Sequence, residues 1–78
     1  MEKALFENPE KAEYVLQVFL RINGQMHETL EIVEEGVSPE EYIAYRRAVG
    51  HLIYEVFEKI IEPICKRHPS LRPPEMES

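Results

Sequence analysis

The chain lacks several residue types on which other protein classes depend. Among its 78 residues there is no Trp and no Asp, and Cys65 is the only cysteine. A single cysteine cannot form an internal disulfide, which excludes a disulfide-stabilised secreted domain and favours a reducing compartment. No apolar run approaches the ~20 residues that a membrane span needs, and the first residues include no hydrophobic segment typical of a signal peptide. We therefore expect a cytoplasmic protein.

Positive charge is also scarce. Nine Lys and Arg residues stand against 15 acidic residues, all of them Glu, and the net charge is −6. Nucleic acids and anionic membranes select cationic surfaces, so we expect neither as a partner. Glu favours helix more than Asp does, and 44% hydrophobic with 31% charged residues is a globular balance. The composition therefore indicates one small, acidic, all-α domain.

The stretch from Glu35 to Glu41 predicts a hinge between two helices. Gly36 can adopt the left-handed conformation that ends one helix. Ser38 can cap the next helix, with Pro39 at its first position and Glu41 completing a capping box. Asn8-Pro9-Glu10 repeats this pattern at the start of the preceding helix, after a leader of residues 1–8.

Apolar residues recur every three or four positions on both sides of this hinge, which predicts two long amphipathic helices. We expect one helix over about 9–35 and another over about 39–62, with a kink or an end at Pro63 and a further turn to Arg67. The short connection makes the two helices antiparallel. The predicted fold is an all-α hairpin, a single domain over 1–68, followed by a disordered tail over 69–78.

The apolar arc of each helix is wider than one neighbouring helix can cover, so we expect two hairpins to pair as a four-helix bundle. The candidate residues of that dimer interface are Phe19, Ile22, Met26, Tyr42, Tyr45, Val49, Ile53 and Phe57.

Folding the chain about Val37 brings Gly24 to the level of Gly50. The two glycines indicate either a close approach of the helices, with space for a ligand, or two tolerated glycines without a shared role.

Three polar residues, Asn23, His27 and Arg46, lie in or beside the apolar arcs. One hypothesis is a ligand site in which Arg46 binds a small anion and His27 assists. The alternative is a paired structural layer that fixes the register and the oligomeric state.

No arrangement of a nucleophile with a base is visible, so we predict no catalytic residues and no cofactor. The pairs His27/Glu31 and His51/Glu55 share helix faces, but they lack the Glu-x-x-His pattern of helical metal sites, and we predict no resident metal. Two functional hypotheses remain. The first is a homodimeric protein–protein interaction or regulatory module, not an enzyme. The second is a bundle that binds a small anion or a metal, or a modest enzyme, at the Asn23, His27 and Arg46 layer.

Overall fold

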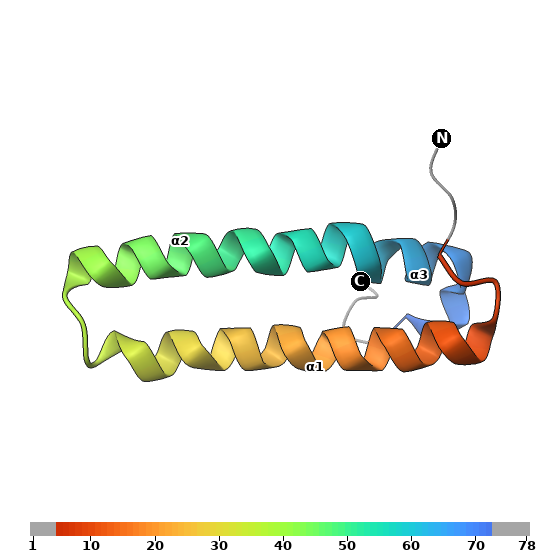
Figure 1. The fold of residues 1–78 in the computed structure, drawn as a ribbon, viewed down its shortest axis with the longest axis horizontal. Coiled ribbons are helices and arrows are strands. Elements are labelled where there is room, and N and C mark those ends of the chain that lie inside the picture. Colours follow the sequence, from red (N-terminus) through yellow and green to blue (C-terminus); the bar gives the residue numbers. More distant parts are fainter. Residues whose placement is uncertain (1–4, 73–78) are drawn as a thin grey trace.

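A computed structural model describes residues 5–72, and these form a helical hairpin (Figure 1). Helix α1 spans Pro9–Glu34 and helix α2 spans Pro39–Val56. A π-helical turn, η1 (Phe57–Ile61), continues α2 into α3 (Glu62–Arg67), and a 3₁₀ turn, η2 (Pro69–Leu71), follows. The described residues contain no β-strand, and the two long helices pack against each other. The predicted all-α antiparallel hairpin is confirmed.

Both predicted N-terminal caps are present. The side-chain oxygen of Asn8 accepts hydrogen bonds from the N–H groups of Glu10 (2.8 Å) and Lys11 (3.4 Å). Ser38 and Glu41 form the reciprocal capping box, in which each side chain accepts from the backbone N–H of the other at 3.2 Å. These bonds satisfy N–H groups that have no partner within the helix.

The end of α1 differs from the prediction. The described glycines all have negative φ, so a left-handed Gly36 is wrong. The N–H of Gly36 instead donates to the carbonyl oxygen of Val33 at 3.0 Å, and Glu35 keeps a helical conformation. This tighter turn closes α1 with ordinary backbone angles, so the chain reaches Ser38 without the glycine-specific conformation.

The helix continues past Pro63 instead of ending there. The change of geometry lies one turn earlier, where the N–H of Glu62 donates to the carbonyl oxygen of Phe57. In an α-helix the Pro63 ring would meet the carbonyl of Lys59; the π-turn is wider, because its hydrogen bonds span five residues instead of four, and this gives the ring more room. The helical path then continues through the predicted further turn to Arg67.

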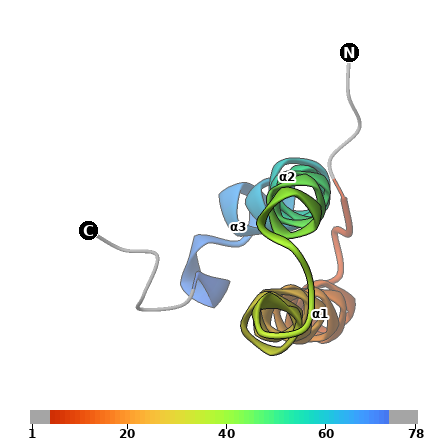
Figure 2. The ribbon, with the colours of Figure 1, turned by 90° about the vertical axis from the view of Figure 1, so that its left-hand side faces the viewer.

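The core lies at the end of the hairpin away from the hinge. Its fully buried cluster consists of Ala12, Leu16, Ile61, Ile64 and Cys65. Viewed along the long axis, α3 and η2 lie on one side of the α1–α2 pair and the segment before α1 passes on the other (Figure 2). Leu5 and Leu71, from these two segments, pack against the cluster.

The predicted disorder of residues 69–78 is therefore wrong for residues 69–72. Pro69–Leu71 form η2, and the side chain of Leu71 has apolar partners in the core. The predicted tail residues 73–78 and leader residues 1–4 lie outside the described part of the chain.

The half of the hairpin nearest the hinge, the hinge half, has almost no buried core and makes the molecule elongated. The molecule measures 45 × 27 × 23 Å, and its radius of gyration of 15.0 Å exceeds the roughly 11–12 Å of a compact domain of this length. Val49 is the only buried residue between the core cluster and the hinge within the described chain. Of the helices described, none combines the length and the apolar character that crossing a membrane requires.

Candidate functional site

One hydrogen bond between side chains sets the register of the two long helices. The hydroxyl oxygens of Thr29, in α1, and Tyr45, in α2, lie 2.7 Å apart. The Thr29 hydroxyl also donates to the carbonyl oxygen of Met26 at 2.7 Å, so its oxygen accepts the proton of Tyr45. Thr29 and Tyr45 are equally far from Val37 along the chain, which agrees with the predicted fold about that residue. Sequence reasoning missed this pair, although its symmetric placement about Val37 was a usable signal.

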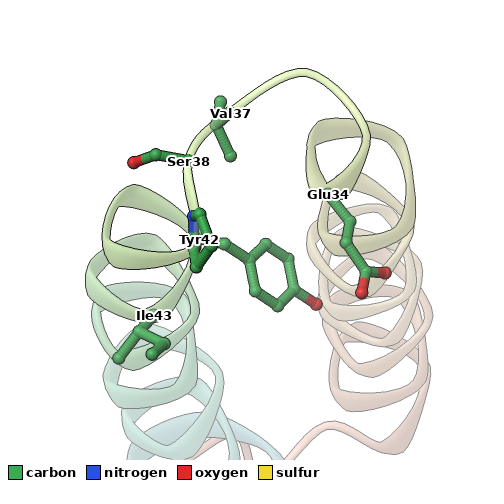
Figure 3. Close-up of a pocket in the computed structure, with 6 residues that line it drawn as sticks. Glu34, Val37, Ser38, Tyr42 and Ile43 are labelled. Atoms are coloured by element: carbon green, nitrogen blue, oxygen red, sulfur yellow. The ribbon is translucent and has the colours of Figure 1, made fainter.

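A shallow open groove lies beside the hinge (Figure 3). It has a volume of about 290 Å³, and its lining residues are Glu34, Val37, Ser38, Pro39, Tyr42 and Ile43. The ring of Tyr42 points across the gap toward α1, whereas Ile43 stays on the α2 side. Small-molecule pockets enclose most of the ligand surface in ~300–1,000 Å³, so this groove better suits an apolar side chain from an approaching protein.

The three residues of the predicted polar layer do not form a joined site. Asn23 is half-buried, whereas His27 and Arg46 are exposed. Within residues 5–72, none of the three side chains makes a hydrogen bond or an ion pair. The side-chain oxygen of Asn23 is itself buried without a hydrogen-bond partner. Because that atom is an acceptor, it calls for a donor and not for an anion.

The predicted dimer residues divide into two groups. Val49 is 4% exposed, so it packs inside the hairpin, and Phe19 and Phe57 pack against the core cluster. The others are half-buried or, for Tyr45, 37% exposed; they are Ile22, Met26, Tyr42, Tyr45 and Ile53.

Several apolar side chains outside the predicted dimer interface are more exposed than these. Ile43 is 48% exposed, Leu52 56% and Tyr54 60%. Tyr14 and Ile32, on α1, are also exposed. The apolar periodicity predicts a broad arc on each helix, but it does not separate the part of the arc that the partner helix of the hairpin covers.

The two glycines do not mark a close approach of α1 and α2. A Cβ atom placed on Gly24 or on Gly50 would meet no atom within 4 Å. The expectation of a close helix contact therefore fails within the hairpin, because the two residues share a level along the axis but point outward. Any contact through them would have to come from another molecule.

Contacts between the two chain ends close the opposite end of the hairpin. The Nε2 atom of His68 lies 2.8 Å from the carbonyl oxygen of Phe6, and Arg67 Nη2 lies 3.8 Å from a carboxylate oxygen of Glu7. The ring of His68 is half-buried, since the chain folds back after α3 and brings it to the leader. Phe6 has φ 61, the one positive value in the described chain.

Cys65 is the only nucleophilic thiol, and it is fully buried. Desolvation by burial raises the pKa of the thiol; the nearby charge of Arg72 opposes this rise and that of Glu62 adds to it. A raised pKa lowers the thiolate fraction at neutral pH, so Cys65 is a core residue and not a reactive one.

No group of three or more His, Cys, Asp or Glu side chains within residues 5–72 is arranged to hold a metal ion. The acidic side chains instead gather around the hinge, where residues 28–41 carry glutamates and no Lys or Arg. These glutamates, all exposed, are Glu28, Glu31, Glu34, Glu35, Glu40 and Glu41.

The geometry thus offers a thin, partly apolar hinge half with an acidic tip, and a closed, packed opposite end. Compared with known proteins, the chain matches no protein-family model, no curated protein and no solved structure.

Proposed function

We propose that this chain is a non-enzymatic interaction module, a helical hairpin that pairs with a second copy as a four-helix bundle and acts on other proteins through binding. The observation that carries this proposal is the uncovered hinge half. Within residues 5–72 the two helices pack there only on each other, and apolar side chains such as Ile43 and Leu52 remain about half exposed.

Size supports self-association. A domain of fewer than about 80 residues buries too little surface for a large stability margin, and pairing is a common remedy. Five of the six buried side chains of the described chain lie in one cluster at the far end. A second hairpin against the hinge half would supply a core where the described part of one chain buries only Val49.

The acidic tip gives the partner class. An uncompensated group of glutamates raises the encounter rate with cationic surfaces and repels acidic ones. A dimer would carry two such tips, so we propose a protein partner with a basic segment. The single buried cysteine is consistent with the reducing cytoplasm as the site of action.

The alternative of a small-anion or metal site has weaker support. Arg46 and His27 are exposed, Asn23 presents an acceptor, and no hydrogen bond joins the three in the described chain. We therefore propose no ligand and no catalytic role for this layer.

Sedimentation equilibrium of the purified chain tests the proposal. We expect a dimer at micromolar concentration and a monomer–dimer equilibrium on dilution. A folded monomer at the same micromolar concentration, with its full helical circular dichroism, would overturn the proposal.

A further inference from the structure

A stripe on α2 continues the surface that the core already covers. Ile43, Gly50 and Phe57 follow one another at intervals of seven residues, with Arg46 and Ile53 between them, so all five lie along one side of the helix. Phe57, at one end of this stripe, packs against the core cluster. Ile43, at the other end, is 48% exposed. The same stripe is thus covered near the chain ends and uncovered near the hinge.

Gly50 lies in the middle of the uncovered part. A side chain at this position would meet nothing within 4 Å, so the hairpin itself gains no contact from the glycine, and Gly destabilises a helix interior relative to Ala. Its missing side chain leaves a notch between Ile43 and Phe57, where another helix can approach closely.

Gly24 on α1 provides the contrast. It too has open space around it, but the residues seven positions away are Gln17 and Glu31, both exposed and polar. A notch among polar side chains offers no apolar surface to a second helix. Gly50, in contrast, has apolar residues seven positions away on both sides, with Arg46 and Arg47 beside it on the hinge side.

Charge selects how a second copy would lie on the stripe. A parallel arrangement would place the acidic tips of both copies, residues 28–41, beside each other without any cation between them. An antiparallel arrangement moves each tip toward the opposite end of the other copy, which is nearly neutral because exposed Lys59, Lys66 and Arg67 offset the glutamates there, two of them in the pairs Lys59–Glu55 and Arg67–Glu7. Like charges brought together are destabilising, so the antiparallel arrangement is favoured.

Arg46 gains a partner in the same arrangement. It is exposed and makes no ion pair within residues 5–72. Arg46 and Tyr54 lie equally far from Gly50 on opposite sides, so a two-fold axis at Gly50 brings Arg46 of one copy to the level of Tyr54 of the other. Tyr54 is 60% exposed, and a guanidinium over its ring is a favourable cation–π contact.

We infer that the second copy packs antiparallel on this α2 stripe, with the two-fold axis at Gly50. This inference rests on the proposed self-association and adds to it the interface and the orientation.

The first test compares Gly50→Gln with Gly24→Gln by sedimentation equilibrium. Both variants place the same neutral helix-forming side chain into open space on one hairpin helix, so both keep the monomer fold. Gln at position 50 fills the notch, and we expect the dimer dissociation constant to rise at least tenfold. Gly24→Gln should dimerise like the parent chain. Equal dimerisation of Gly50→Gln and the parent would overturn the inference.

The second test measures orientation by pulsed electron paramagnetic resonance on Glu40→Cys carrying a nitroxide label. Cys65 stays in place because it is buried, and mass spectrometry checks for one label per chain. Position 40 lies ten residues from Gly50, so an antiparallel dimer separates the two labels by about 30 Å along the axis. A parallel dimer would bring them to about the ~10 Å spacing of packed helices plus the label arms. A short distance would overturn the antiparallel inference.

The outcomes separate the two proposals. A parent chain that is monomeric at micromolar concentration overturns the proposed function. If the parent is dimeric and Gly50→Gln dimerises equally well, only the inferred interface is overturned. If the parent is dimeric and the label distance is short, only the inferred orientation is overturned.

Discussion

Ile64 and Ile32 allow the same substitution in two opposite environments. Ile64 is 0% exposed in α3, inside the core cluster, whereas Ile32 is 75% exposed on α1. Replacing either by Ala removes the same atoms. Any difference in the free energy of unfolding therefore reports the packing of Ile64 within the core cluster and not the chemistry of the side chain.

The expected cost at Ile64 follows from its burial. Three carbon groups at ~0.8 kcal/mol each give about 2.4 kcal/mol of lost transfer free energy. The cavity left behind brings the total to roughly 2.5–4 kcal/mol, within the range of Ile→Ala changes in cores. A chain of this length has a total stability of roughly 4–12 kcal/mol, so Ile64→Ala should lower the melting temperature by about 10–25 °C. Ile32→Ala should stay within about 0.5 kcal/mol of the parent.

Urea unfolding followed by helical circular dichroism measures both changes. The two variants and the parent are compared at one protein concentration, because association with a second copy stabilises the folded state by mass action. An Ile64→Ala variant within about 0.5 kcal/mol of the parent would refute the packing of α3 and the position of the core. A large loss at Ile32 would refute its exposure.

Three further predictions follow from single residues. Ser38→Ala should cost about 1 kcal/mol of unfolding free energy, since it leaves the Glu41 N–H without its acceptor; Ser70→Ala, in η2 without a capping role, is the control, and equal stabilities would contradict the cap. Asn23→Leu should raise the free energy of unfolding by roughly 1–2 kcal/mol, because it removes a buried oxygen without a partner; a lower melting temperature would mean that this oxygen is satisfied in solution. Burial raises the pKa of the Cys65 thiol, so the folded chain holds that proton more tightly than the unfolded chain. The stability that the protonated Cys65 thiol contributes is complete below the unfolded pKa of about 8.5, and it is lost as the pH rises through the folded pKa. Cys65→Ala should remove this part of the decline in the free energy of unfolding with pH, measured by urea unfolding.

The starts of the helices could be predicted from local signals in the chain. Caps such as Asn8-Pro9 and Ser38-Pro39-Glu40-Glu41 act through bonds between residues two or three positions apart, so they are readable without knowledge of the rest of the chain. The short connection likewise predicts antiparallel helices and the level at which residues meet, which the bond between Thr29 and Tyr45 confirms.

The rotation of each helix about its own axis could not be predicted from such local signals. Gly24 and Gly50 share a level but point outward, because a level depends on distance from the hinge and direction depends on which part of a wide apolar arc packs inward. With apolar residues over about half of each helix, several rotations bury similar areas. The same ambiguity placed the buried Val49 among the candidate dimer residues and left Tyr54 out.

By itself, the sequence determined the helical class, the hinge, the caps and the antiparallel register, all of which depend on local bonds and chain connectivity. The tertiary structure decided that the core gathers at the chain ends, where α3, η2 and the leader meet, and that the hinge half stays thin. These features depend on contacts between residues far apart in the chain, such as His68 with Phe6 and Leu71 with the core cluster. The π-turn at Phe57–Ile61 belongs with them, since it accommodates Pro63 while Ile64 and Cys65 remain in the core.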